Sequence, residues 1–327
     1  MQLRLAYHPE GGATLTTMKH DTTAPSVRLA HNPGPIDAYG ALSKPDAGGA
    51  FGKVPSVRLA LTISESDGGA MRSTNLERAV NGSGEAPALL VSYVYLEPFL
   101  KNQHRYLYRD WVLDSGAFSA HNSGRTISLD KYIDTARRLL DADPTLSEVF
   151  ALDVIGDGKA SLKNCEAMWK AGIAAIPCFH RGTPEAELKH IAKDYPKIAL
   201  GGVALLKGAA KMKFAQQAFA RVWPCRIHGF GFGSESQVMA LPWHSVDATN
   251  WELGPCKFGR WQSFGQMSVR GSNQNLRAEV EWYLRLEARA RKKWAQQMAE
   301  LDARCAPVVR LAAGSKVGSL INSKINP

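Results

Sequence analysis

The stretch WVLDSGAFSAHNSG, residues 111–124, runs from apolar residues through a carboxylate into a series of small residues. Trp111, Val112 and Leu113 are typical of the end of a strand, and Asp114 follows them directly. A carboxylate that is merely buried costs free energy, so its place at the end of a strand indicates that a site opens there. Whether the rest of the chain repeats this pattern decides the fold.

From about residue 88, strand-like apolar runs alternate with helical ones. The strand-like runs cover 88–96, 111–118, 148–155, 173–180, 197–204, 226–233 and 243–250. Helices are predicted from a cap at Ser128, near 161–171, from an N1-type position at Pro184, near 208–220 and near 234–240. This alternation indicates βα units and a parallel sheet. Right-handed crossovers leave an open doubly wound sheet or a closed barrel, and the absence of a G-x-G-x-x-G motif favours the barrel.

The predicted fold is therefore an α/β protein built as a (β/α)8 TIM-type barrel, with a less regular N-terminal segment and a basic C-terminal helix. Residues 1–85 are rich in Gly, Pro, Ser and Thr and are assigned to the irregular segment. The motif PSVRLA occurs there twice, at 25–30 and 55–60, and one copy is a candidate barrel strand. The catalytic barrel is assigned to residues 86–272, and the basic helix and tail to residues 273–327.

Composition narrows the class of protein. The 40 Lys and Arg residues against 30 Asp and Glu residues give a formal net charge of +10, which suits a polyanionic partner. No apolar run reaches the roughly 18 residues of a membrane span, and the N-terminus lacks the apolar segment of a signal peptide. The five cysteines contain no C-x-x-C pair, so neither a disulfide framework nor a zinc ribbon is indicated. A cytoplasmic protein without a membrane partner is expected.

Polar residues and glycines recur at the ends of the predicted strands. They are Asp114, Asp153, His180, Gly201, Gly202, His228, Gly229 and Asp247. Each has an ordinary alternative, because an aspartate can cap the next helix, a histidine can belong to the core and a glycine can relieve crowding. Their coincidence on one rim favours an active site, since the carboxyl ends of barrel strands carry the active site in this fold.

Three carboxylates on one rim are suited to acid–base or nucleophilic chemistry. Like charges held close together raise the pKa of one carboxyl group and leave another ionised. This arrangement serves displacement at an anomeric carbon, where one carboxylate attacks C1′ and the other carries a proton to and from the leaving group. The chemistry needs no metal and no cofactor, and none is expected.

Five motifs carry a resemblance to a known family. In order they are LDSGAFS, FALDVIGD, ALGGVA, HGFGFG and SVDATNW, and they lie within residues 110–255. Together they resemble the tRNA-guanine transglycosylase superfamily, and above all its phage branch, the DNA 7-deazaguanine transglycosylases. The resemblance implies a (β/α)8 barrel that exchanges a guanine in nucleic acid for a 7-deazaguanine. It also implies a host-cytoplasm location if the gene is phage-encoded.

The resemblance implies a role for several residues. Asp247 would be the nucleophile and Asp114 the general acid and base. Phe118 would stack on the base, and Asp153 would bind its Watson–Crick edge. The remaining contacts would come from the backbone at Gly202 and Val203, which would meet O6 and the 7-substituent, and from His180, which stands where the tRNA enzymes carry a glutamine. Gly201, His228 and Gly229 are grouped with these substrate-binding positions.

Departures from the tRNA enzymes favour DNA as the substrate. The chain lacks their C-x-C-x-x-C zinc motif, and it carries Ala117 and Ser119 where they carry glycine and glutamine. The expected partners are therefore DNA and a free 7-deazaguanine base. The same chemistry on tRNA is the first alternative, and a non-catalytic nucleic-acid-binding barrel is the second. An unrelated barrel lyase or aldolase is a third, although no lysine occupies an obvious Schiff-base position at a strand end.

The C-terminal region supports a nucleic-acid partner independently. Residues 256–327 contain 13 Lys and Arg against 5 acidic residues, so they carry +8 of the +10 charge. A long helix is predicted over 275–305, with Leu276, Val280, Tyr283 and Leu284 on one side. The candidate phosphate contacts are Arg289, Arg291, Lys292 and Lys293 on this helix, and Lys257 and Arg260, which are interleaved with Trp251, Phe258 and Trp261. The alternatives are a solvated helix that covers the barrel and aromatic residues that pack in the core.

Overall fold

A computed structural model describes residues 55–61, 85–258, 260–263, 265–266 and 276–304. All of them belong to one compact unit, Ser43–Pro327. Residues 1–54, which include the first PSVRLA copy, and the tail 305–327 lie outside the described residues, as do residues 62–84. The second PSVRLA copy is described, and it forms the strand β1.

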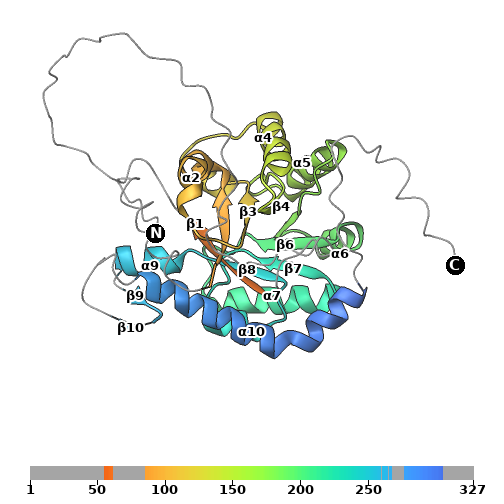
Figure 1. Cartoon of the computed structure of the whole chain (residues 1–327). Helices are drawn as coiled ribbons and strands as arrows, with labels where there is room; N and C mark the ends of the chain where they lie inside the picture. The colour runs from red at the N-terminus through yellow and green to blue at the C-terminus, as the bar shows by residue number, and fades with distance from the viewer. Residues whose placement is uncertain (1–54, 62–84, 259, 264, 267–275, 305–327) are drawn as a thin grey trace, which may run out of the picture. The chain divides into compact units, whose positions relative to one another are not determined.

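Eight parallel strands form the centre of the molecule (Figure 1). They are β1 Ser56–Leu61, β2 Ala88–Ser92, β3 Asp110–Asp114, β4 Leu146–Val149, β5 Cys178–His180, β6 Lys197–Gly201, β7 Arg226–Gly229 and β8 Ser245–Ala248. Neighbours in sequence are neighbours in the sheet, and β8 pairs with β1. A parallel bridge between Phe150 and Ile176 joins the β4 side to the β5 side and completes the ring. The predicted (β/α)8 TIM-type barrel is therefore confirmed.

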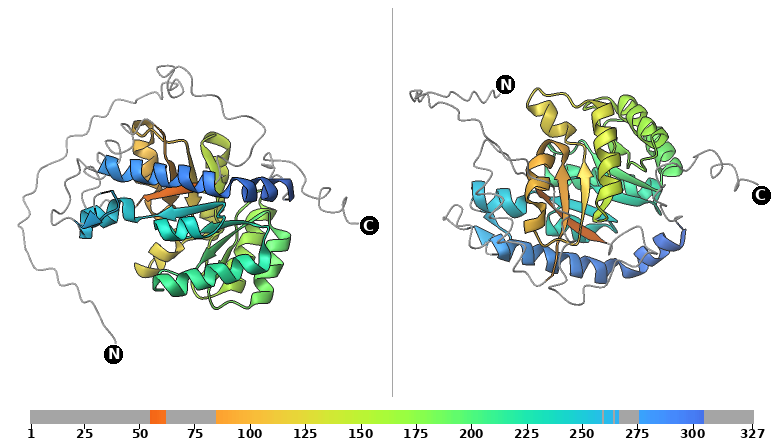
Figure 2. Two further views of the ribbon diagram at one scale, coloured as in Figure 1. Left: turned by 90° about the horizontal axis from the view of Figure 1, so that it is seen from below. Right: turned by 45° about the horizontal axis from the view of Figure 1, so that its top comes forward.

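Helices follow the strands and cover the barrel (Figure 2). They are α2 Leu96–Asn102, α3 Ala117–Asn122, α4 Leu129–Ala142, α5 Gly158–Lys170, α6 Glu185–Asp194, α7 Gly208–Val222, α8 Glu235–Ala240, α9 Asn250–Phe258 and α10 Leu276–Arg304. Two 3-10 turns, η2 Tyr93–Tyr95 and η3 Gln103–Arg105, flank α2, and β9 Arg260–Trp261 pairs antiparallel with β10 Gly265–Gln266. Among the described residues, no helix is long and apolar enough to cross a membrane.

Local signals explain where two of the helices begin. The Ser128 side chain accepts a hydrogen bond from the Lys131 backbone N–H, so it caps α4 as predicted. Pro184 is the N-cap of α6 and not its first residue, which moves the predicted start by one position. The predicted helix 275–305 is observed as α10. Leu276, Val280 and Tyr283 are buried as predicted, whereas Leu284 is only half-buried.

Side chains alternate between the barrel interior and the surrounding helix layer, as the period of a strand requires. On β1, Val57, Leu59 and Leu61 belong to the large cluster under the helices, while Ala60 packs with Val112 inside the barrel. The same alternation continues upward along β3 to Asp114, at the carboxyl end of that strand. Inward-facing side chains at the carboxyl ends of the strands therefore meet at one opening of the barrel, which we call the mouth.

Charged pairs fill the interior near the amino ends of the strands. The Arg58 guanidinium donates to Asp110 at 2.5 Å, and the Lys197 ammonium donates to both Glu148 oxygens at 2.7 Å. Burial raises the pKa of Asp110, but the charges of Arg58 and Arg109 outweigh it and bring that pKa down to about 2. Arg58, Asp110, Glu148 and Lys197 are therefore each in contact with an opposite charge, as burial in a low-dielectric interior favours.

Candidate functional site

Asp114 lies at the carboxyl end of β3, where its Oδ2 accepts a hydrogen bond from the Gly116 backbone N–H at 3.0 Å. Gly116 has φ +72°, and a Cβ there would lie 2.7 Å from the Ser92 hydroxyl, so glycine is required at this turn. Burial raises the pKa of Asp114 to about 7, and the nearby charges of Asp153 and Asp247 add to the rise. Asp114 can therefore both donate and accept a proton near neutral pH.

Asp247 lies on β8, and its Oδ1 accepts the Gly231 backbone N–H at 2.7 Å. The imidazole Nε2 of His228, from β7, lies 3.6 Å from the same oxygen. Burial lowers the pKa of His228 and outweighs the opposing influence of Asp247, so the imidazole is neutral. Oδ2 of Asp247 has no hydrogen-bond partner among the described residues.

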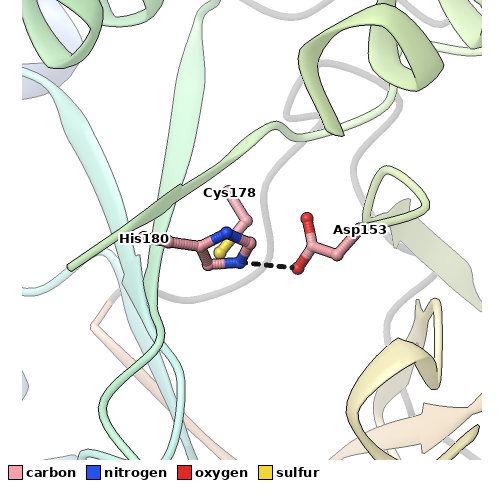
Figure 3. Close-up of side chains that lie close together, drawn as sticks. All are labelled: Asp153, Cys178 and His180. Atoms are coloured by element: carbon pink, nitrogen blue, oxygen red, sulfur yellow. Dashed lines mark hydrogen bonds and ion pairs between the residues drawn. The ribbon is translucent and has the colours of Figure 1, made fainter. Parts of the chain in front are cut away.

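Asp153, Cys178 and His180 form a compact group at the next part of the mouth (Figure 3). The His180 Nε2 lies 3.1 Å from Asp153 Oδ2. Burial lowers the pKa of His180, but the hydrogen bond to Asp153 and the charges of Asp153 and Glu187 together outweigh burial and bring the pKa above the usual value. The second ring nitrogen of His180, Nδ1, and the second carboxylate oxygen of Asp153, Oδ1, are buried without a hydrogen-bond partner. They remain available to a bound ligand.

This group bears on the expectation that the protein needs no metal. One ligand atom from each of Asp153, Cys178 and His180 lies within 4.8 Å of the other two, so the donor set could hold a metal ion. Burial, followed by the charges of Asp153 and Asp114, raises the pKa of the Cys178 thiol well above its usual value. These three side chains are the ones that would supply the ligands of such an ion.

The glycines that were predicted at the site have different structural reasons. A Cβ on Gly201 would lie 2.6 Å from the Cys178 sulfur, so Gly201 makes room for the Asp153–Cys178–His180 group. Gly202 is exposed and has φ +70°, whereas the neighbouring Val203 is buried. A Cβ on Gly229 would lie 2.7 Å from the Trp243 ring, so tight packing explains this glycine.

Exposed apolar side chains gather on loops that follow the strands. Phe118 is 51% exposed after β3, and Leu205 is 96% exposed after β6. Val154 and Ile155, in the segment after β4, are also exposed. Large exposed apolar residues in the described part of the chain are confined to these three segments, which border the mouth. They supply an apolar lip for a flat or hydrophobic ligand.

A cavity of about 380 Å³ lies beside the mouth, against α6 and α7. Its lining includes Phe179, Arg181, Lys213, Phe214, Gln217 and Arg221. The Phe179 and Phe214 rings are stacked with their centroids 6.0 Å apart. Arg221 is paired with Glu185 at 2.5 Å, whereas Arg181 and Lys213 have no ion pair within the described residues. The cavity is therefore basic at its edge.

The basic residues of α10 lie elsewhere. Arg291 is ion-paired with Glu287 and donates to the Pro55 carbonyl, just before β1, and Glu287 accepts the Val57 N–H at 2.7 Å. These contacts are at the amino ends of the strands, opposite to Asp114 and Asp247. Of the other predicted phosphate contacts on this helix, Arg289 pairs with Glu235 at 2.6 Å, Lys293 donates to the Met239 carbonyl, and Lys292 is exposed.

The residues after Asp247 are only partly described. Trp251 is buried and donates to the Ala60 carbonyl at 3.0 Å, and Trp261 is buried as well. Core packing therefore explains both tryptophans. Arg260 is exposed, and the side chains of Lys257 and Phe258 lie outside the described residues. The structure thus brings together Asp114, Asp153, His180, His228 and Asp247, and it does not bring the α10 cluster to them.

Three residues near the mouth were missed from the sequence. Cys178 and Ser245 each precede a predicted site residue by two positions, so the period of a strand could have placed them on the same face. Lys211 lies in α7, with its ammonium 4.5 Å from the Phe232 ring centre and hydrogen-bonded to the Gly231 carbonyl. Nothing in the local sequence predicts this third position, because it depends on how α7 packs.

No family model and no curated protein matches the sequence. Three solved structures that are similar to it are variants of the tryptophan synthase alpha-subunit from the hyperthermophile Pyrococcus furiosus. The first is 15% identical with a TM-score of 0.39, covering 70% of this chain and 97% of that one. The second is 14% identical with a TM-score of 0.37, covering 73% and 98%, and the third is 12% identical with a TM-score of 0.36, covering 73% and 97%. The fold assignment rests on the strand order and ring closure described above.

Proposed function

We propose that the protein is a base transglycosylase that exchanges guanine in DNA for a 7-deazaguanine through a covalent aspartyl-glycosyl intermediate. The observation that carries the proposal is that two carboxylates at the mouth, Asp114 and Asp247, have different surroundings. Asp114 has a pKa raised to about 7 by burial and by its acidic neighbours, and Asp247 is held by a backbone N–H beside a neutral histidine. Glycosyl transfer with retention needs such a pair, one as proton carrier and one as nucleophile.

The proposed reaction has two displacement steps. An oxygen of Asp247 attacks C1′ of the target nucleotide, the bond from C1′ to the guanine nitrogen breaks, and the proton of Asp114 goes to the departing base. The incoming 7-deazaguanine then gives its ring N–H proton to Asp114 as that nitrogen attacks C1′ and releases Asp247. Protons and electron pairs balance over the two steps, and Asp114 returns to its starting state.

Base recognition is assigned to the neighbouring part of the mouth. A guanine-like base presents a ring N–H and an amino group on one edge, and Asp153 Oδ1 is a buried acceptor without a partner. A buried acceptor of this kind favours a base that supplies a donor. Phe118 and the rest of the apolar lip would cover the flat face of a base that has left its stack. His180 holds Asp153 in place through its 3.1 Å contact.

The decisive experiment measures incorporation of a labelled 7-deazaguanine into DNA and into tRNA by the purified protein. Incorporation into DNA and not into tRNA is expected. Asp247→Asn should lower the rate more than about 10³-fold while DNA binding survives, because an amide cannot form the glycosyl ester. Asp157→Asn, at the N-cap of α5, is the matched control and should keep its activity.

The other outcomes decide against parts of the proposal. Incorporation into tRNA alone would replace DNA by tRNA as the substrate and keep the chemistry. Near-normal exchange by Asp247→Asn would remove the nucleophile assignment. If neither nucleic acid is labelled while DNA still binds tightly, the protein is a binding barrel and not this enzyme.

A further inference from the structure

A chain of hydrogen bonds runs through the barrel interior behind Asp247. The Lys197 ammonium on β6 donates to both oxygens of Glu148 and also to the Ser245 hydroxyl at 3.0 Å. That hydroxyl lies 2.8 Å from Nδ1 of His228. Lys197, Ser245 and His228 are all buried, so these bonds are shielded from bulk solvent. Among the residues that the structure describes, this chain links the charged layer of the barrel to the catalytic rim.

The direction of each bond in the chain follows from donor and acceptor chemistry. An ammonium group has donors and no acceptor, so the Ser245 oxygen accepts from Lys197. The hydroxyl hydrogen of Ser245 then needs an acceptor, and His228 Nδ1 is the one within hydrogen-bond distance among the described residues. Nδ1 of His228 therefore carries a lone pair. In a neutral imidazole the proton must then be on Nε2.

The contacts of the second ring nitrogen, Nε2, independently indicate that Nε2 carries the proton. His228 Nε2 faces Asp247 Oδ1 at 3.6 Å and is otherwise buried without a hydrogen-bond partner. The opposite tautomer would direct a nitrogen lone pair at a carboxylate oxygen, which is repulsive. Burial lowers the pKa of His228, so a doubly protonated ring is not the resting form. The contacts at both nitrogens agree on one tautomer.

We propose that Lys197, acting through Ser245, fixes His228 as the Nε2–H tautomer and so aims a neutral N–H donor at the Asp247 carboxylate. Lys197 and Ser245 are positioning residues in this scheme. The donor stabilises the negative charge that returns to Asp247 when the glycosyl group moves to the incoming base. With Oδ1 engaged by Gly231 and His228, Oδ2 is the oxygen left to attack C1′. This inference rests on the proposed function for its catalytic part, and the tautomer stands apart from it.

The test is ¹⁵N NMR of the imidazole nitrogens in the full-length protein, with the His228 signals assigned by their loss in a His228→Gln sample. The expected wild-type result is a protonated Nε2 and an unprotonated Nδ1. Ser245→Ala should raise the fraction of rings protonated on Nδ1, because Nδ1 loses its hydrogen-bond donor while only the contact with Asp247 remains, and Ser245→Thr should preserve the wild-type pattern. The matched control is Ser147→Ala, which removes a hydroxyl bound to Asp110 and has no contact with His228. It should leave the His228 signals unchanged.

Base-exchange kinetics complete the test. Ser245→Ala should lower kcat about 10- to 100-fold with little change in KM, while Ser245→Thr and Ser147→Ala stay close to wild type. A wild-type ring protonated on Nδ1 would overturn the tautomer assignment. Unchanged signals in Ser245→Ala would overturn the proposal that Lys197, acting through Ser245, fixes that tautomer. Full turnover by Ser245→Ala with an altered tautomer would overturn its catalytic role. A wild-type protein without exchange activity would instead refute the proposed function, and the NMR result would still decide the tautomer.

Discussion

Asp114 makes the stability of the fold depend on pH in a direction that can be worked out. The pKa of its carboxyl group is about 7 in the folded protein and about 3.8 in an unfolded chain. Between about pH 4 and pH 7 the folded state therefore holds a proton that the unfolded state has released. The stabilisation of the folded state that comes from this bound proton is fully present below about pH 4 and is lost as the pH rises through 7.

We therefore expect Asp114→Asn to become more stable relative to wild type as the pH rises from 5 to 8. The amide resembles the protonated carboxyl group and avoids the cost of burying its charge, and the gain is expected to be of the order of a few kcal/mol. Denaturant unfolding at both pH values measures it. Asp134→Asn, at an exposed position on α4, is the control and should follow the wild type. If the free-energy difference between Asp114→Asn and wild type does not change with pH, the carboxyl group is not held in its protonated form.

Individual site residues differ in how far the sequence could predict them. Asp114 could be placed because it directly ends an apolar run, and Asp247 because it lies in the last predicted strand, 243–250, and the carboxyl ends of parallel strands meet at one rim. His228, which contacts Asp247, was placed on the same rim, but the contacts behind it, deeper in the barrel, could not be predicted. Lys197 reaches Ser245 from another strand, and such a contact depends on the register between strands and the curvature of the barrel. Neither quantity appears in the local pattern.

At the scale of elements, β5 and β6 approach closely at the mouth because Gly201 has no side chain. Gly201→Ala should destabilise the protein by about 1–3 kcal/mol, since the added methyl group would lie 2.6 Å from the Cys178 sulfur and 3.2 Å from the His180 ring. Urea unfolding measures the loss. Gly208→Ala is the control, because nothing lies within 4 Å of its new methyl group and helix α7 begins there. That variant should gain up to about 1 kcal/mol, and equal effects of the two substitutions would contradict the steric argument.

The strands are shorter than their apolar runs. The predicted strand over 88–96 ends at Ser92, and the chain then turns through η2 into α2. An apolar run continues in both elements because the barrel buries the strand and the first residues of the helix alike, so hydrophobicity does not mark the boundary. The choice between the two PSVRLA copies was also open, since identical residues have identical local preferences.

At the scale of the whole molecule, the described part of the chain offers two groups of basic side chains to a polyanion. One is on α10. The sequence predicted this helix correctly, but it could not predict where the helix packs on the barrel. Contacts of Glu287 with Val57 and of Arg226 with Asp302 hold α10 at the amino ends of the strands. The other is at the edge of the mouth, where Arg181 and Lys207 follow β5 and β6 and Lys213 borders the cavity.

A nucleic acid whose target base enters the mouth must place its phosphates near that edge. Replacing Arg181, Lys207 and Lys213 together by alanine should therefore flatten the dependence of log affinity on log salt by up to about 3 units, at roughly 0.9 per lost phosphate contact. The same treatment of Arg289, Lys292 and Lys293 should leave the slope unchanged, with Arg291 retained because it binds Glu287. Salt titrations of DNA binding by the two variants measure both slopes. A flatter slope in the α10 variant alone would move the DNA path to the opposite end of the barrel, away from Asp247, and would contradict the placement of the base.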